Sequence, residues 1–261
     1  MRNLIYVNMM RLKKSRIFRA GVAVSMAYVA FLLFMNYQEV ADSPETVIGQ
    51  LNWYFLSTLP VASAFCSVFC GMFLGTDYSD GTMRNKLMVG HIRKEIYLAN
   101  LLTVFLSNAF VYLAGCLVTA VMGTAMFGWN LANPMQLAFR MFSGILMLGA
   151  YAGVFTLLSM LIDNKAISAT VCMVLYVVLF LGAPFLQTAV FSYYHGASLN
   201  HMPSESIRPL LEFLYDFLPV GQELQISGIF IHLYRLPVYS VICIALTTIC
   251  GMAVFTKKDL K

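Results

Sequence analysis

Residues able to hold a metal ion are few and loosely spaced in this sequence. His195 and His201 lie six positions apart, and Glu205 follows. Imidazole and carboxylate groups bind zinc, but this spacing matches no zinc motif, so we predict no metal site. The six cysteines all lie in apolar stretches, where cysteine behaves as a small hydrophobic residue.

Motifs for nucleotide binding and for hydrolysis are also missing. The sequence has no HExxH motif, and no pair of aspartates lies in an apolar segment. It has no GxxxxGK[ST] loop: Gly71 and Gly75 are four positions apart, and no lysine follows them. We therefore expect no catalytic residue, no cofactor and no ATP hydrolysis in this chain.

The composition shows which elements must position any functional residues. Of 261 residues, 60% are hydrophobic and only 11% are charged, and the mean hydropathy is +0.76. Soluble domains carry about 25% charged residues, so most of this surface must face lipid. The net charge of +5 lies in short segments between apolar runs, which argues against nucleic-acid binding.

Six apolar segments are long enough to cross a bilayer as helices. We predict an all-α, polytopic membrane protein with a single transmembrane domain over residues 1–261. The third span is longer than a bilayer requires, so we expect it to tilt. The predicted spans are 20–37, 53–75, 96–127, 135–162, 166–190 and 237–255.

The basic residues fall on one side of this six-span arrangement. By the positive-inside rule that side is cytoplasmic, so both termini are expected in the cytoplasm of a bacterial cell and the protein in its plasma membrane. The opposite side has only Arg208 and Arg235, with Arg140 near the outer end of the fourth span. The cytoplasmic basic residues are Arg2, Arg11, Lys13, Lys14, Arg16, Arg19, Arg84, Lys86, Arg93, Lys94, Lys165, Lys257, Lys258 and Lys261.

Two cytoplasmic segments have amphipathic patterns. In residues 1–16, apolar side chains recur at helical spacing among basic ones, which fits a helix in the lipid headgroup layer or a basic anchor that sets topology. The loop 76–95 reads TDYSDGTMRNKLMVGHIRKE. We expect Thr82 or Asp80 to cap a short helix whose Met83, Leu87 and Met88 are exposed and dock on another protein.

This loop resembles that of the permease subunit of ABC-2 type ABC transporters. The similar residues are the run from Asp77 to Thr82 (Asp-Tyr-Ser-Asp-Gly-Thr), then Leu87, then Arg93 at the start of a long apolar helix. The sequence departs from the family pattern at Gly90, where proline is usual, at Asn100, where lysine is usual, and at Asp77, where glutamate is commoner. The six spans and the basic N-terminal segment extend the resemblance over nearly the whole chain.

The resemblance implies partners and sites. The loop would form a coupling helix in a cleft of a separate ATP-binding subunit, and the N-terminal helix would lie against that subunit. The chain would pair with a second permease subunit, as a homodimer or a heterodimer, and bind membrane lipid. The implied ATPase contacts are Asp80, Gly81, Thr82, Arg84, Leu87, His91 and Arg93.

The outer segment 191–236 carries a third amphipathic pattern. Gly182-Ala183-Pro184 should break the fifth span, since proline removes a backbone hydrogen bond. We then expect a helix capped by Ser204 or Ser206 and ending near Pro219, either on the outer leaflet or, as the resemblance implies, dipping back to close a translocation path. The implied gate residues are Gly182, Pro184, Leu214 and Phe217.

Inside the predicted spans almost no residue is ionisable, so an ion-coupled carrier lacks its usual groups. Polar residues such as Asn100, Ser107, Asn108 and Thr119 either line a path or bond between helices. We expect a permease subunit that exports a substrate with energy from a separate ATPase. The alternatives are a membrane anchoring, assembly or immunity protein and an intramembrane enzyme.

Overall fold

A computed structural model of the chain describes residues 1–42, 50–129, 131–195 and 205–258, and every regular element in these ranges is a helix. Six helical segments are long and apolar enough to cross a membrane, which confirms the predicted number of spans. Their bounds are Arg16–Tyr37, Leu51–Ser79, Arg93–Phe127, Pro134–Leu161, Lys165–Ser192 and Leu233–Lys257.

The helices follow one another with short connections. The long ones are α2 (Arg16–Asp42), α3 (Gln50–Ser79), α5 (Arg93–Val118), α7 (Pro134–Leu161), α8 (Lys165–His195) and α11 (Leu236–Lys257). The short ones are α1 (Arg2–Lys14), α4 (Thr82–Met88), α6 (Thr124–Phe127), α9 (Arg208–Phe217) and α10 (Pro219–Ser227). Short turns η2 (Thr119–Gly123), η3 (Glu205–Ile207) and η4 (Leu233–Arg235) complete the described elements.

Two of the long helices form the centre of the bundle, and others surround them. In the most apolar 18-residue stretch of α3 and of α7, 67% of the residues are buried. The corresponding share is 17% for α2 and 22% for α8 and for α11. The outward faces of these three peripheral helices carry large apolar side chains, including Phe34, Val178 and Ile249. A helix that is apolar on its exposed side as well as its buried side is stable in lipid, not in water.

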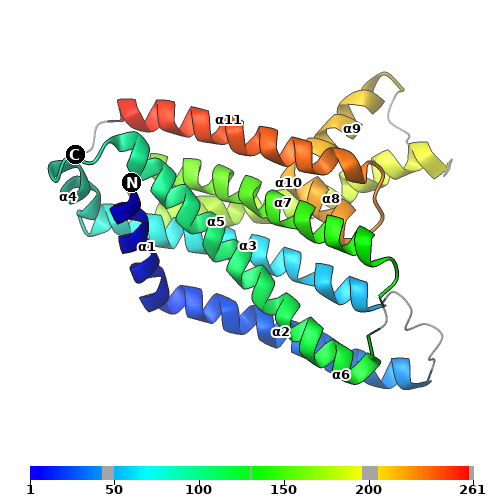
Figure 1. Ribbon diagram of the computed structural model, residues 1–261. Coiled ribbons are helices and arrows are strands. Elements are labelled where there is room, and N and C mark those ends of the chain that lie inside the picture. Colours follow the sequence, from blue (N-terminus) through cyan, green and yellow to red (C-terminus); the bar gives the residue numbers. More distant parts are fainter. Residues whose placement is uncertain (43–49, 130, 196–204, 259–261) are drawn as a thin grey trace.

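The third span is the longest, and it runs obliquely. It consists of α5, the π-helical turn η2 and α6, and it spans 35 residues from Arg93 to Phe127. Figure 1 shows α5 crossing the bundle at an angle to α2 and α3. It contacts α1, α2, α3, α7 and α11, so the tilt expected from its length lets one helix touch most of the others.

Small residues allow close packing between helices of this chain. A Cβ atom added at Gly71 of α3 would lie 2.4 Å from Cα of Ala169 on α8, and one at Gly153 of α7 would lie 2.3 Å from Oγ1 of Thr247 on α11. Each of the two glycines lies four positions from another glycine, Gly75 and Gly149 respectively, and these contacts lie within the chain.

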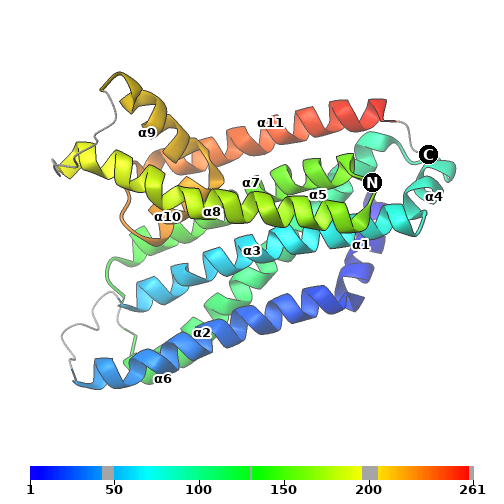
Figure 2. The ribbon, with the colours of Figure 1, turned by 180° about the vertical axis from the view of Figure 1, so that it is seen from behind.

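The two ends of the bundle differ in what they contain. Figures 1 and 2 show α1, α4 and the C-terminal end of α11 together at one end, and α9 and α10 at the other. We call the first the α4 end and the second the α10 end. The segments predicted to be cytoplasmic therefore share one end.

Candidate functional site

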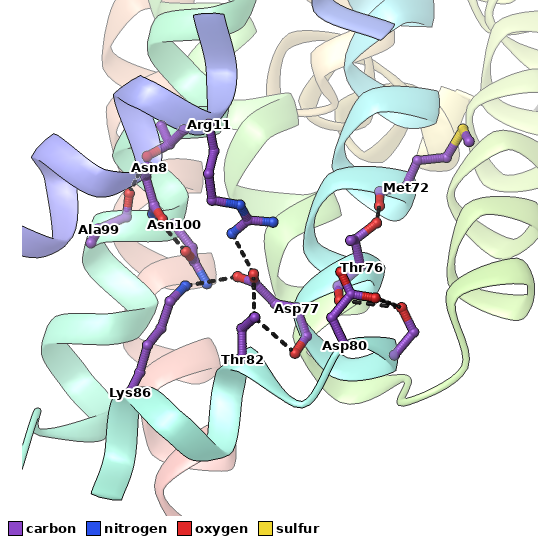
Figure 3. A network of polar contacts seen from close by, with 12 residues as sticks. Asn8, Arg11, Met72, Thr76, Asp77, Asp80, Thr82, Lys86, Ala99 and Asn100 are labelled. Atoms are coloured by element: carbon purple, nitrogen blue, oxygen red, sulfur yellow. Dashed lines mark hydrogen bonds and ion pairs between the residues drawn. The ribbon is translucent and has the colours of Figure 1, made fainter. Parts of the chain in front are cut away.

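At the α4 end, one buried carboxylate holds three elements together (Figure 3). Asp77 lies near the C-terminus of α3, and its side chain is fully buried. Its Oδ2 accepts a hydrogen bond from Nζ of Lys86 on α4 at 2.9 Å, and its Oδ1 accepts one from Oγ1 of Thr82 at 2.8 Å. Arg11 of α1 forms an ion pair with the same Oδ1. A single acidic group thus binds α1, α3 and α4.

The turn before α4 brings Thr82 and Lys86 to this carboxylate. Gly81 has a φ of +64°, in the left-handed region that glycine adopts without a steric cost. The chain reverses there, and Oγ1 of Thr82 also donates to the Asp77 carbonyl at 3.2 Å. Met83, in the first turn of α4, is 1% exposed. The short helix is therefore packed against α3 and is not a free connector.

Helix α1 is fixed to the bundle by polar contacts as well as apolar ones. Nδ2 of Asn8 donates to Oδ1 of Asn100 on α5 at 2.9 Å, and both side chains are buried. The Arg11 guanidinium carbon lies 4.7 Å from the centroid of the Phe73 ring, a cation–π geometry. Leu4 and Leu12 are buried. The side of α1 that carries Leu4 and Leu12 therefore packs on protein and is not free to face the lipid headgroup layer.

Hydrogen bonds join the C-terminal end of α11 to the start of α5, and Lys258, just after α11, to the end of α7. Arg93, at the start of α5, donates from Nη1 to the carbonyls of Phe255 at 3.1 Å and Thr256 at 3.3 Å, and also to that of Lys258. Nζ of Lys258 donates to the carbonyls of Met160 and Leu161, each at 3.0 Å. These cations satisfy carbonyls at the ends of α11 and α7 that have no helical partner.

The residues expected to contact a partner protein differ in how far their side chains are exposed. Asp80 and Arg84 are exposed. The structure differs most from expectation at Arg93, which is turned toward the end of α11, and at Thr82, which is turned toward Asp77. The others, Gly81, Leu87 and His91, are half-buried; Nδ1 of His91 lies 4.0 Å from Oε2 of Glu95.

The expected helix cap and apolar stripe of α4 need correction. The residue before α4 is Gly81, and no side-chain hydrogen bond caps the helix, so neither Thr82 nor Asp80 has that role. Met83 is buried, and the exposed apolar residues come later: Met88 is 77% exposed, Val89 78% and Ile92 64%. We call Met88, Val89 and Ile92 the apolar tip. Because α4 ends at Met88, helical periodicity could not predict its last two members.

At the α10 end, the expected break in the fifth span is absent. Helix α8 continues through Gly182, Ala183 and Pro184 to His195. Proline is tolerated inside a spanning helix when neighbouring groups satisfy the carbonyl that loses its partner. Gly182 and Pro184 are exposed on α8.

The predicted outer amphipathic helix exists as α9 and ends near Pro219 as expected, but its expected serine cap is not found. No side-chain bond caps it, so Ser206 does not have that role, and Ser204 lies outside the described residues. It ends at Phe217, and Pro219 begins a second helix, α10. Leu214 and Phe217 are half-buried, and Phe217 borders an apolar pocket of about 330 Å³ that also includes Tyr151 of α7.

Several contacts at both ends had little or no signal in the sequence. Asp77 was visible as part of a motif, but its partner Arg11 is 66 positions away. The described side chains contain no group of three or more metal-ligating residues, and those of His195, His201 and Glu205 lie outside the described part.

No family model matches the sequence, and no curated protein matches it.

Proposed function

We propose that this protein is the membrane-spanning subunit of an ABC-2 type exporter that works with a separate ATP-binding subunit and as a dimer of permease subunits. The observation that supports this most is the combination of an anchored loop and an exposed apolar tip at the α4 end. The loop is held by Asp77 through the hydrogen bonds and ion pairs of Arg11, Thr82 and Lys86.

The contacts of Asp77 connect the movement of α4 to that of α3 and α1. A force applied to α4 acts on α3 through Asp77, and on α1 through Arg11. Helix α1 in turn is bonded to α5 by the contact of Asn8 with Asn100. In the proposed cycle, ATP binding moves the partner subunit, α4 moves with it, and the spans α3 and α5 change the access to a path between permease subunits.

The exposed tip gives a means of docking. Met88, Val89 and Ile92 are exposed, and Arg84 is exposed on α4 one turn before Met88. Large apolar side chains next to a basic one are typical of the centre of a protein interface. In this proposal Arg84 and the apolar tip contact the ATPase. Arg93 does not contact it but donates to carbonyls at the end of α11.

Co-purification tests the proposal directly. The tagged protein, extracted from its native membrane in mild detergent, is expected to bring an ATP-hydrolysing chain in about equal amount. Val89→Glu and Ile92→Glu place a carboxylate in the apolar tip and should reduce the bound ATPase at least about tenfold, which corresponds to about 1.4 kcal/mol.

Met135→Glu is the matched control. Met135 is 81% exposed at the start of α7, at the α10 end of the bundle, so its substitution should leave the bound ATPase unchanged. All three variants should elute and melt like the wild type. A wild-type preparation with no nucleotide-binding partner would overturn the proposal and favour an anchoring, assembly or immunity protein.

A further inference from the structure

Helix α10 carries one acidic side chain into the interior of the bundle. Glu223 is 1% exposed. Helix α10 packs against α3, α7, α8 and α9, at the end of the molecule opposite to α4 (Figure 1). The candidate site around Asp77 lies at that other end, so Glu223 has no part in it.

The two oxygens of this carboxyl group have different surroundings. Oε2 accepts a hydrogen bond from the hydroxyl of Tyr151 on α7 at 2.8 Å. Oε1 is buried and has no hydrogen-bond partner. The Tyr176 ring on α8 lies edge-on to Tyr151, with the ring centroids 6.0 Å apart, and its hydroxyl donates to the Pro60 carbonyl. The aromatic rings of Tyr151 and Tyr176 therefore border this side of the site.

None of the elements packed against α10 supplies Glu223 with a positive charge in the described part of the chain. From α7 and α8 the titratable groups are Tyr151 and Tyr176. From α3 comes the hydroxyl of Ser63, which donates to the Leu59 carbonyl. Arg140, the basic residue of α7, donates to the Gly228 carbonyl instead.

A neighbouring buried acid, Asp216, has a partner for each of its carboxylate oxygens. Asp216 of α9 is also buried, but Nδ1 of His232 lies 3.1 Å from its Oδ2, and Nε2 of Gln225 donates to its Oδ1 at 2.8 Å. Gln222, next to Glu223, accepts a bond from Ser240 at 2.6 Å. The side chains of Gln222 and Gln225 on α10 thus have partners, and Glu223 Oε1 does not.

An ionised carboxylate in this position would be costly. Removing a charge from water costs several kcal/mol unless opposite charge and hydrogen bonds replace the solvent, and Glu223 has one hydrogen bond. Burial raises the pKa of Glu223 to about 7, although the hydrogen bond from the Tyr151 hydroxyl favours the charged form.

From this geometry we infer that Glu223 is a proton-binding site: its carboxyl group holds a proton while α10 is packed in the bundle and releases it to water when α10 moves outward. The only ligand is H⁺, and its release leaves the carboxylate of Glu223 and a hydronium ion. The inference does not depend on an ATPase partner. It makes the packing of α10 sensitive to pH.

The sign of the pH effect follows from the two protonation states. The packed form has a carboxyl pKa of about 7, and a solvated carboxyl has the ordinary value of 4.5. The packed form therefore binds the proton more tightly, and its stability falls as the pH rises from about 4.5 to about 7. The difference between these two pKa values corresponds to a fall of up to about 300-fold in the equilibrium constant for packing.

Infrared spectroscopy of the purified full-length protein tests the protonation state. Among the absorptions of the protonated carboxylic acids, one component should titrate with a midpoint of about 7, above those of solvated carboxyl groups. It should be lost in Glu223→Gln and kept in Glu212→Gln. Glu212 is the matched control because it lies on the adjacent α9 and its Oε1 accepts a bond from Nε of Arg208 at 2.8 Å.

Hydrogen exchange of residues 208–227, corrected for the intrinsic pH dependence, tests the movement. Exchange should rise with pH in the wild type and in Glu212→Gln, and stay low in Glu223→Gln. If Glu223→Gln does not fold, Tyr151→Phe serves instead: it removes the donor that favours the charge, so the infrared midpoint should move to higher pH. A Glu223 carboxyl that is already ionised well below neutral pH, or an unchanged midpoint in Tyr151→Phe, would overturn the inference.

Discussion

The Asp77 carboxylate has no contact with solvent, whereas its cationic partners keep part of their surface in water. The Arg11 side chain is 30% exposed and that of Lys86 is 12% exposed. Removing one partner of a buried ion pair costs more than the pair contributes, because the remaining charge loses its compensation. Asp77 is therefore the residue on which the packing of α1 and α4 depends most.

Asp77→Asn should lower the free energy of unfolding by about 2 to 3 kcal/mol, below the largest values for buried pairs because Arg11 stays partly hydrated. Denaturant unfolding in detergent measures it. Asp80→Asn, three residues later at an exposed position, is the control and should change stability by less than about 0.5 kcal/mol. Equal stability of Asp77→Asn and the wild type would show that the ion pairs of Asp77 do not hold α1 and α4 in place.

At the scale of elements, two glycines of this chain have opposite roles. Gly81 is in the left-handed region, where the chain turns from α3 into α4. Gly182 lies within the continuous helix α8, and a Cβ atom added there would meet no atom within 4 Å. The same substitution should therefore have opposite effects at the two positions.

Gly81→Ala should destabilise the protein by about 1 to 2 kcal/mol, because an L-residue has a steric cost in the left-handed region. Gly182→Ala should stabilise it by about 0.5 to 1 kcal/mol, because alanine loses less backbone entropy in a helix. The melting temperatures of both variants, measured side by side in detergent, test this. A loss of stability in Gly182→Ala would indicate that α8 is broken at this point, as the sequence had led us to expect.

At the scale of the whole molecule, the α4 end contains several basic side chains, the start of α1 and the C-terminal end of α11. Arg11, Lys86, Arg93 and Lys258 all make their contacts there. Basic residues near spans are retained on the cytoplasmic side during insertion. We therefore expect the α4 end in the cytoplasm and the α10 end, with Glu223, toward the outside.

Reporter fusions test this orientation. Green fluorescent protein joined to the C-terminus should fluoresce, and alkaline phosphatase joined there should be inactive. Alkaline phosphatase fused after residue 200, between α8 and α9, should be active, since this segment is expected outside. The reverse pattern would place the apolar tip outside the cell, where no ATPase subunit is available, and would contradict the proposed function as well.

The sequence by itself determined the number of spans and their approximate ends. Each span depends on the length and hydropathy of a contiguous segment, and the bilayer requires the same property of every spanning helix. The amphipathic helices α1 and α9 were visible for a similar reason, because their periodicity is local. The motif around Asp77 also drew attention to the loop in which Thr82 and Lys86 contact the Asp77 carboxylate.

Only the tertiary structure decided how buried polar groups pair. Asp77 and Arg11 are 66 positions apart, and Tyr151 and Glu223 are 72 apart. Which side of α1 or of α4 is buried, and whether α8 continues through Pro184, depend on neighbours that local patterns do not contain. A buried charge is stable only beside the partner that packing brings to it, so these contacts follow from the arrangement of the helices and not from any one of them.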